Sequence, residues 1–233
     1  MIDKQRLTEK AAKYGIDAAP IAQELAQYAS LLVSYNEKVN LTAITDAEGI
    51  ENKHFIDSLL LASCPEVHGK MVDVGTGAGF PGIVTKLYKP EIELTLLEPT
   101  GKRVDFLRYA CAELGIEAEF AKERAEEAAR KQWRETFDVA TARAVAALPV
   151  LAEYCLPLVR VGGMFIAMKG SGADEELEVA RGAVEKLGGK YHDSRSFTLP
   201  DGSARTLLFF KKISQTSSVY PRNGGKIAKA PLH

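Results

Sequence analysis

Residues 72–82 read Val-Asp-Val-Gly-Thr-Gly-Ala-Gly-Phe-Pro-Gly, and this stretch decides the fold. An apolar run ends at Val74, glycines follow at alternate positions (Gly75, Gly77 and Gly79), and Pro81 suits the first turn of a helix. Glycines let a backbone turn tightly and approach a ligand without Cβ clashes, and N–H groups at a helix start can bind an anionic group. The stretch therefore predicts a strand, a nucleotide-binding turn and a helix in succession.

Downstream of this turn, apolar runs alternate with helical patterns. We expect strands at 71–74, 92–97, 116–121, 137–141 and 164–168, and helices at 102–114, 147–158 and 173–187. This alternation predicts βαβ units on a parallel sheet that is covered on both faces. Two last β-rich runs, 194–199 and 206–211, are joined by a link too short for a crossover helix, so they should pair antiparallel. The combination is typical of class I S-adenosylmethionine-dependent methyltransferases, a Rossmann-like α/β fold.

The segments before and after this α/β unit have different sequence patterns. Apolar residues recur at helical spacing from Ile21 to Tyr35, and Thr45-x-x-Glu48 fits a capping box that opens a helix running through Leu61. From Lys211 to the end there are five cations and no acidic residue. We therefore expect a small N-terminal helical region (1–66), a methyltransferase domain (67–213) and a basic C-terminal tail (214–233).

Composition excludes several other classes. The chain has 233 residues with a net charge of −1, its start is charged, and no apolar run is long enough to span a membrane. Three widely spaced cysteines (Cys64, Cys111 and Cys155) lack the paired spacing of a metal site and are expected to be buried, reduced thiols. We predict a cytoplasmic protein without a metal. The basic tail indicates a phosphate-rich partner.

The glycine turn leaves the cofactor open between two classes. Residues 77–82 also fit G-x-G-x-x-G, the dinucleotide fingerprint, so an NAD-dependent oxidoreductase is the alternative. Asp73, at the strand end, can face a cationic amine or sulfonium rather than a pyrophosphate. Glu98, 19 residues after Gly79, can accept from both ribose hydroxyls, although both cofactor types use an acid there. No second catalytic domain follows, which favours a methyltransferase; a non-catalytic RNA-binding module is a third possibility.

Other motifs follow one another in a family-specific order. They are Tyr35-Asn-Glu-Lys-Val-Asn-Leu-Thr-Ala-Ile44, His54-Phe-Ile-Asp-Ser-Leu59, Gly101-Lys-Arg103, Arg124-Ala-Glu126, Thr141-Ala-Arg-Ala144 and Met168-Lys-Gly170. Together with the glycine turn they resemble the glucose-inhibited division protein B family (RsmG), methyltransferases of 16S ribosomal RNA. The stretches Tyr220-Pro-Arg222 and Lys229-Ala-Pro231 are similar to family members from Gram-positive bacteria.

This resemblance implies transfer of a methyl group from S-adenosylmethionine to N7 of a guanine in 16S ribosomal RNA, with S-adenosylhomocysteine as product. It implies cofactor contacts at Gly75, Phe80, Ala125-Glu126 and Arg143. Glu98 stands where many members carry Asp, and the carboxylate is kept. Whether the substrate is naked RNA, an assembly intermediate or the finished small subunit stays open, and we expect a monomer.

Several basic residues are candidates for contacts with RNA. Arg143 and Lys169 follow successive strands, at the sheet edge where α/β proteins bind ligands, and are predicted to position phosphate or the guanine. Further candidates are Lys102, Arg103, Arg222, Lys226 and Lys229. His54 and Asp57, three residues apart on one helix face, are interpreted as a structural hydrogen-bonded pair. The acidic face of the helix at 174–187, which includes Glu176, is assigned no function.

Overall fold

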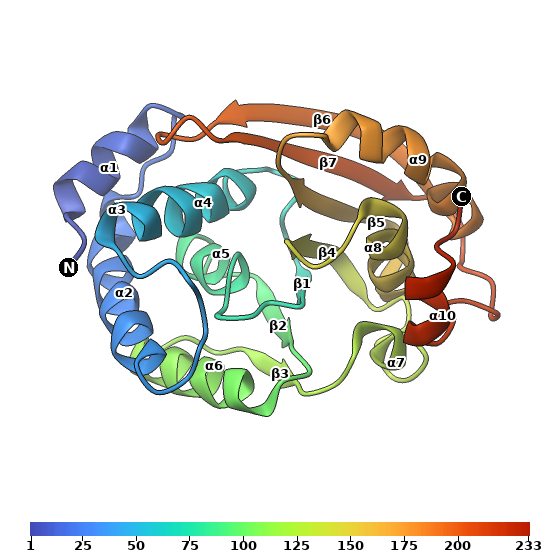
Figure 1. Cartoon of the computed structure of the whole chain (residues 1–233), viewed down its shortest axis with the longest axis horizontal. Coiled ribbons are helices and arrows are strands. Elements are labelled where there is room, and N and C mark those ends of the chain that lie inside the picture. The colour runs from blue at the N-terminus through green and yellow to red at the C-terminus, as the bar shows by residue number, and fades with distance from the viewer.

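The computed structural model describes all 233 residues, arranged as one sheet with helices on both faces (Figure 1). The strands are β1 (Lys70–Val74), β2 (Glu93–Leu97), β3 (Glu119–Ala121), β4 (Phe137–Arg143), β5 (Val159–Lys169), β6 (Gly189–Thr198) and β7 (Ala204–Lys212). The helices are α1 (Lys4–Ala12), α2 (Ala22–Asn36), α3 (Ala47–Gly49), α4 (Asp57–Ala62), α5 (Gly82–Tyr88), α6 (Gly101–Glu113), α7 (Ala125–Ala128), α8 (Leu148–Cys155), α9 (Ala173–Lys186) and α10 (Gly224–Lys229). Short 3₁₀ turns occupy Ala19–Ile21 and Leu156–Leu158, and a π-helical stretch occupies Ile50–Ile56.

The sheet has the strand order β3-β2-β1-β4-β5-β7-β6. Strands β1 to β5 are parallel, and β7 pairs antiparallel with both β5 and β6. The expected α/β sheet with an antiparallel hairpin at its end is thus confirmed. Because β1 to β5 run in the same direction, their carboxyl ends at Val74, Leu97, Ala121, Arg143 and Lys169 share one edge of the sheet.

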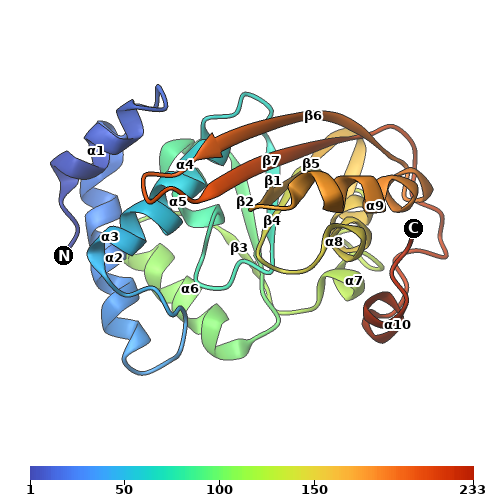
Figure 2. The same cartoon turned by 45° about the horizontal axis from the view of Figure 1, so that its top comes forward.

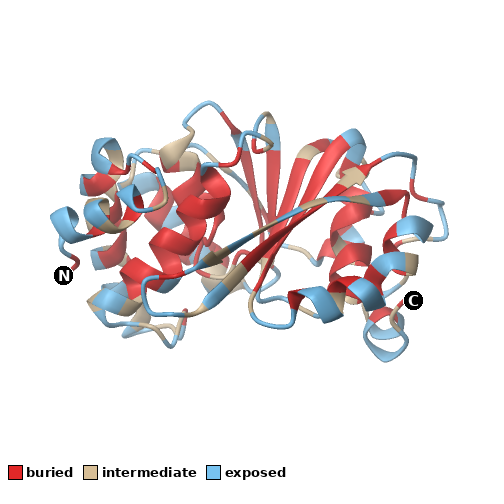
Figure 3. Ribbon diagram, turned by 90° about the horizontal axis from the view of Figure 1, so that it is seen from above, coloured by how far each residue is buried: buried red, intermediate tan, exposed pale blue.

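Buried residues concentrate on the central strands and on the helix faces turned towards them (Figure 3). Helices α7, α8 and α9 cover one face, where Leu151, Phe165 and Phe210 belong to a common core. Helices α5 and α6 cover the other face, and α1 and α2 pack outside them, so that Leu25 shares a core with Leu94. The N-terminal helical region is therefore continuous with the core of the domain.

The start of the second N-terminal helix differs from the expected capping box. Asp46, in extended conformation, is the N-cap, and its carboxylate accepts a hydrogen bond from the Gly49 N–H at 2.7 Å. Thr45 lies one residue too early to cap this helix. The prediction was wrong by one position, because aspartate and threonine are both good N-caps and the spacing alone does not choose between neighbours.

Asp46→Ala should therefore lower the free energy of unfolding by about 1 kcal/mol, the usual contribution of an N-cap. Thr45→Ala is the matched control and should change it much less. Chemical denaturation of both variants measures the difference. A larger loss of stability in the Thr45 variant would show that Thr45 caps the helix after all.

The strand expected at 116–121 is shorter than predicted, because its first residues complete the preceding helix. The Ile116 N–H bonds to the Cys111 carbonyl at 3.0 Å, and Gly115 has a φ of +65°, as in a left-handed helix end. Only Glu119–Ala121 joins the sheet. All three cysteines are free and buried, as expected.

Residues 214–233 are packed on the domain rather than extended from it. Helix α10 lies beside α7 and α8 in both views (Figures 1 and 2), and Ile227 is fully buried. The Arg222 guanidinium binds the buried carboxylate of Glu153 on α8, with Nη2 2.6 Å from Oε2. Arg222 is therefore taken up by an internal ion pair, which removes it from the candidates for RNA binding. Lys226 and Lys229 are exposed.

No helix of this chain combines the length and the apolar character that crossing a membrane would demand.

Candidate active site

The glycine turn joins β1 to α5 and is held by one buried carboxylate. Gly75, Gly77 and Gly79 all have positive φ, of +66°, +60° and +95°, which explains the glycines. The Oδ2 atom of Asp73 accepts hydrogen bonds from the Thr76 hydroxyl (2.6 Å) and the Gly82 N–H (2.8 Å). The Oδ1 atom of Asp73 is buried and has no partner. Burial raises the pKa of Asp73 to about 6, although both hydrogen bonds and the charge of Arg143 oppose the rise.

Glu98 follows β2 and lies directly beside the turn. Its carboxylate is 2% exposed and accepts from the Gly77 N–H (3.1 Å) and the Thr100 N–H (2.9 Å). A methyl group at Gly77 would meet no atom closer than 4.0 Å, so the space above the turn is open. The predicted pair of turn and acid is thus assembled by the parallel pairing of β1 with β2. Arg103, in the first turn of α6, approaches Glu98 at 3.7 Å, whereas Lys102 points to solvent.

Phe80 anchors the turn to the N-terminal helices. The His54 ring stacks on it at 4.3 Å between centroids, and the Tyr28 ring stacks at 5.0 Å. The Tyr28 hydroxyl donates to the Ala78 carbonyl. The Arg143 guanidinium lies 5.4 Å from the centre of the Phe80 ring. Helix α2 therefore supports the turn from outside the sheet, a role that the helical spacing of Tyr28 did not reveal.

Asp57 pairs with two arginines and not with His54. Its Oδ2 accepts from Arg143 Nη1 (2.9 Å) and its Oδ1 from Arg205 Nε (2.6 Å), while the carboxylate itself is fully buried. His54 contacts Thr42 Oγ1 at 3.2 Å and Arg143 Nη2 at 3.4 Å. The expected His54–Asp57 pair is wrong, because two arginines at strand ends offer the carboxylate charged donors that a neutral imidazole cannot match.

His54 is neutral in the folded protein. Burial first, and then the charge of Arg143, lower its pKa from 6.5 to about 3. Since the folded value lies below that of the unfolded chain, His54 contributes stability above about pH 6.5 that is lost as pH falls towards 3. We expect the His54 ring resonances in an NMR titration to stay constant between pH 8 and pH 5, with the His54→Gln spectrum giving the assignment. A midpoint above pH 5 would contradict this.

Lys169, at the end of β5, lines a cavity beside Arg143. Its Nζ donates to the Ala146 carbonyl and to Glu176 Oε2, each at 2.8 Å. Glu176 also accepts from the Leu148 N–H at 2.6 Å. Glu176 thus fixes the start of α8 and the Lys169 ammonium, which corrects the view of it as part of a solvent face. Nothing in the sequence distinguishes Glu176 from the acidic residues beside it, so its contact with Lys169 could not be predicted.

The cavity beside Lys169 has a volume of about 650 Å³ and lies at the carboxyl edge of β4 and β5. Its charged lining comprises four cations and two acids: Lys53, Arg143, Lys169, Arg205, Asp57 and Glu176. With His54 neutral, the lining carries an excess of positive charge, which suits a ligand that bears phosphate. Lys53 and Arg205 were not singled out from the sequence, since they lie far from each other and from Arg143 along the chain.

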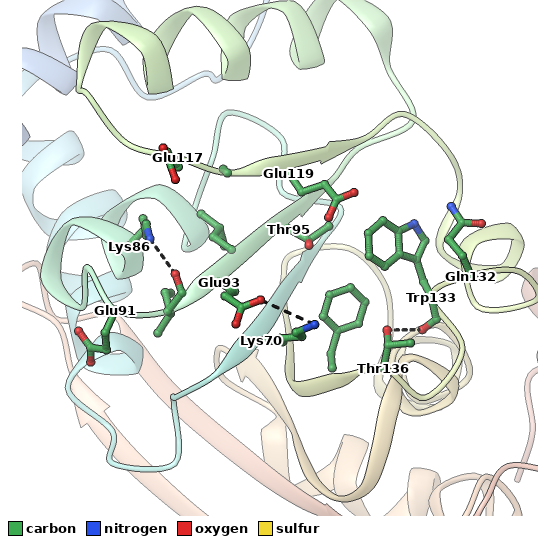
Figure 4. Close-up of a pocket in the computed structure, with 14 residues that line it drawn as sticks. Lys70, Lys86, Glu91, Glu93, Thr95, Glu117, Glu119, Gln132, Trp133 and Thr136 are labelled. Carbon is green, nitrogen blue, oxygen red and sulfur yellow. Dashed lines mark hydrogen bonds and ion pairs between the residues drawn. The ribbon is translucent and has the colours of Figure 1, made fainter.

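A second cavity, of about 630 Å³, lies at the opposite edge of the sheet (Figure 4). Lys70, Glu93 and Glu119 line it at the starts of three parallel strands, and Lys70 pairs with Glu93 at 3.7 Å. None of the predicted site residues belongs to this cavity. The glycine turn and the cavity beside Lys169 lie at the carboxyl edge of the sheet instead.

Glu126 completes the group of predicted residues at the carboxyl edge. It lies in α7, directly after β3, and Ala125 beside it is buried in the core. The Glu126 side chain is only 6% exposed, and neither a hydrogen bond nor an ion pair is formed by its carboxylate. Its oxygens are not among the fully buried atoms that lack a partner, so the carboxylate still reaches solvent and is free to accept a hydrogen bond from a ligand.

The strand order, the glycine turn and the acids at the ends of β1 and β2 define an S-adenosylmethionine-dependent methyltransferase of the Rossmann-like class. Among solved structures, M. jannaschii TYW2 in complex with AdoMet superposes with a TM-score of 0.55 at 14% identity, covering 73% of this chain and 80% of that one. At this identity the likeness supports the fold.

The family follows from closer relatives. The profile of the GidB family, described as rRNA small subunit methyltransferase G, matches residues 21–213. Ribosomal RNA small subunit methyltransferase G of Alkaliphilus metalliredigens is 47% identical, covering 90% of each chain. That of Moorella thermoacetica is 45% identical, covering 100% of each chain. The chain belongs to the rRNA small subunit methyltransferase G family, and the oxidoreductase alternative is not supported.

Proposed function

We propose that this protein transfers a methyl group from S-adenosylmethionine to N7 of a guanine in 16S ribosomal RNA, the guanine-527 type of site, and releases S-adenosylhomocysteine. The observation that carries the proposal is the position of Arg143. Its guanidinium touches Phe80 of the glycine turn and also lines the basic cavity. A cofactor on the turn and a nucleotide in the cavity would therefore meet at this side chain.

The residues around the turn match the polar groups of S-adenosylmethionine. The unpartnered Asp73 Oδ1 suits the ammonium group, and Glu98 suits the two ribose hydroxyls. The Glu126 carboxylate can accept from the exocyclic amine of adenine, with Ala125 beside it. Gly75, Gly77 and Gly79 allow the backbone to approach the ligand. Each of these acids would supply an acceptor for one donor group of the cofactor.

Guanine N7 has a free lone pair at neutral pH, so its attack on the sulfonium methyl group requires no general base. The chain then has to align the nucleophile, exclude water and direct its charges. Arg143 is fixed by Asp57, by the Lys53 carbonyl (2.7 Å) and by Phe80. Neutral His54 adds no charge that would repel the positive charge that develops on the base.

The basic side chains of the cavity are the proposed contacts with RNA. Arg143, Lys53, Lys169 and Arg205 can donate to phosphate or to guanine O6. Arg103, Lys102, Lys226 and Lys229 lie outside the cavity and could contact more distant phosphates. Lys102, Lys226 and Lys229 have no partner that would direct them, and Arg103 has only its contact with Glu98 at 3.7 Å. We therefore assign these outer residues weaker contributions than those of the cavity.

Lys169→Ala should lower kcat/KM for methylation of 16S RNA about tenfold, since it removes one charged contact to the substrate. Binding of S-adenosylhomocysteine should stay unchanged, because Lys169 does not touch the turn. Lys190→Ala, at an exposed position of β6, is the control for loss of one positive charge. Unchanged turnover of the Lys169 variant would reject its role.

Mass-spectrometric mapping of 16S RNA from cells with and without the gene tests the function directly. We expect one methylated guanine to be lost in the deletion strain and restored by the wild-type gene. Purified protein incubated with naked RNA, a partly assembled subunit and the mature subunit then identifies the substrate. If no methyl group is lost, the proposed function is wrong.

We propose further that the protein acts as a monomer in the cytoplasm, where its ribosomal substrate resides. Its exposed large apolar residues, such as Tyr109, Val179 and Val219, belong to separate segments of the chain. Light scattering of the purified protein measures the oligomeric state.

A further inference from the structure

The C-terminal segment, residues 214–233, is tied to the part of the chain that carries Glu126. Arg130, two residues beyond α7, donates from Nε to the Pro221 carbonyl at 2.8 Å. Arg134 donates to the carbonyls of Tyr220 (2.9 Å) and Thr216 (2.5 Å). The segment is therefore held from the side of α7 by two arginines that bind its backbone.

A buried ion pair holds the same segment from the side of α8. The fully buried carboxylate of Glu153 accepts from the Arg222 N–H (2.7 Å), from Nε (2.9 Å) and from Nη2 (2.6 Å). The remaining Nη1 of Arg222 donates to the Ala230 carbonyl at 2.9 Å, which closes the segment around α10. Because one arginine makes several hydrogen bonds to one carboxylate, this ion pair fixes the position of the segment as well as neutralising charge.

Two residues after Arg222, the backbone meets Glu126. A methyl group on Gly224 would overlap Oε1 of Glu126, so only glycine leaves the carboxylate where it is. Gly225, the next residue, has no such contact: its nearest neighbour would be Asn223 Oδ1 at 3.7 Å. Neither glycine has a positive φ, so close approach to Glu126, and not backbone conformation, requires glycine at 224.

We propose that the C-terminal segment is part of the cofactor site, with Gly224 as the positioning residue for the Glu126 carboxylate. This inference rests on the proposed contact between Glu126 and the adenine amine. Glu126 has no hydrogen-bond partner within the chain, and the Gly224 backbone lies directly against one side of its carboxylate. The segment thereby sets the selectivity for adenine over a base with a carbonyl at the same position.

The test compares two ligands by calorimetry in the absence of RNA: S-adenosylhomocysteine and S-inosylhomocysteine, in which a carbonyl replaces the amine. The wild type should prefer the adenosyl ligand by at least about tenfold, because the inosyl carbonyl would face a carboxylate. Gly224→Ala should weaken adenosyl binding about tenfold and leave inosyl binding nearly unchanged. The carboxylate is the flexible end of a side chain, so it should move while the thermal unfolding midpoint stays the same.

Gly225→Ala is the matched control and should bind both ligands as the wild type does. Glu126→Ala should abolish the preference, and adding Gly224→Ala to it should have no further effect, as expected for residues that act through one contact. If Gly224→Ala is unfolded, Arg222→Lys replaces it, since a lysine cannot bind Glu153 with a fork and should loosen the segment.

Two contrary outcomes are distinguishable. If Glu126→Ala loses the preference but Gly224→Ala and Arg222→Lys keep it, the segment does not position Glu126, and the proposed cofactor contact stands. If Glu126→Ala keeps the preference, the proposed contact of Glu126 is wrong, and the inference about Gly224 falls with it.

Discussion

An Asp57→Asn variant is expected to lose about 3 kcal/mol of folding free energy, because breaking a buried ion pair leaves its partners without compensation. Asp57 is fully buried, and it is the one carboxylate that binds both Arg143 and Arg205. The amide keeps the shape of the side chain but removes the charge. Both guanidinium groups would then share a small cavity with no counter-ion between them.

The same variant should methylate 16S RNA roughly 100-fold more slowly, the scale of loss that a displacement of about 1 Å produces at a reacting centre. Arg143 would move away from Phe80 and from the cavity, since Asp57 sets its orientation. Chemical denaturation measures the stability and single-turnover methylation measures the rate. Asp174→Asn, on the exposed side of α9, controls for loss of one carboxylate. Full activity in the Asp57 variant would show that Arg143 needs no such support.

The second large effect is expected at Glu98. Glu98→Ala should raise the Kd for S-adenosylhomocysteine about 100-fold, because two charge-assisted hydrogen bonds contribute at least about 1.5 kcal/mol each and 1.4 kcal/mol corresponds to tenfold. The variant also frees the Gly77 N–H, which Glu98 binds at 3.1 Å. Isothermal titration calorimetry without RNA measures this loss.

Glu98→Asp is the informative control, since it keeps the carboxylate and shortens the side chain by one methylene. It should retain binding within about tenfold of the wild type, as expected when a hydrogen bond is lengthened but not removed. If Glu98→Ala binds S-adenosylhomocysteine as tightly as the wild type does, the carboxylate does not bind the ribose.

Much of the fold is predictable from local patterns. The alternation of apolar runs and helical stretches predicted every strand of the parallel sheet, and the short link at 200–203 predicted the antiparallel hairpin. Errors occurred at the ends of elements, where neighbouring residues compete. Asp46 replaced Thr45 as N-cap, and Ile116 joined the end of α6 instead of a strand. These choices depend on a single hydrogen bond, which spacing does not specify.

The candidate site likewise has features that local patterns predict and features that they do not. The placement of Asp73, Glu98 and Arg143 at one edge could be predicted, because each lies at the carboxyl end of a strand and parallel strands bring these ends together. Glu126 was expected only from the family resemblance. The partners of these residues could not be predicted. Asp57 binds Arg205 across 148 positions of the chain, a pairing that exists only once β7 lies beside β5.

For the stretch at 72–82, local sequence is enough to specify a strand, a tight turn and a helix, since glycines at alternate positions permit the positive φ values that the turn requires. The residues that surround this turn are brought there by the packing of distant segments. Stacking of Tyr28 and His54 on Phe80, and the packing of Gly224 against Glu126, are contacts between distant segments. They form because the folded core brings those surfaces together, and no local preference of the chain encodes them.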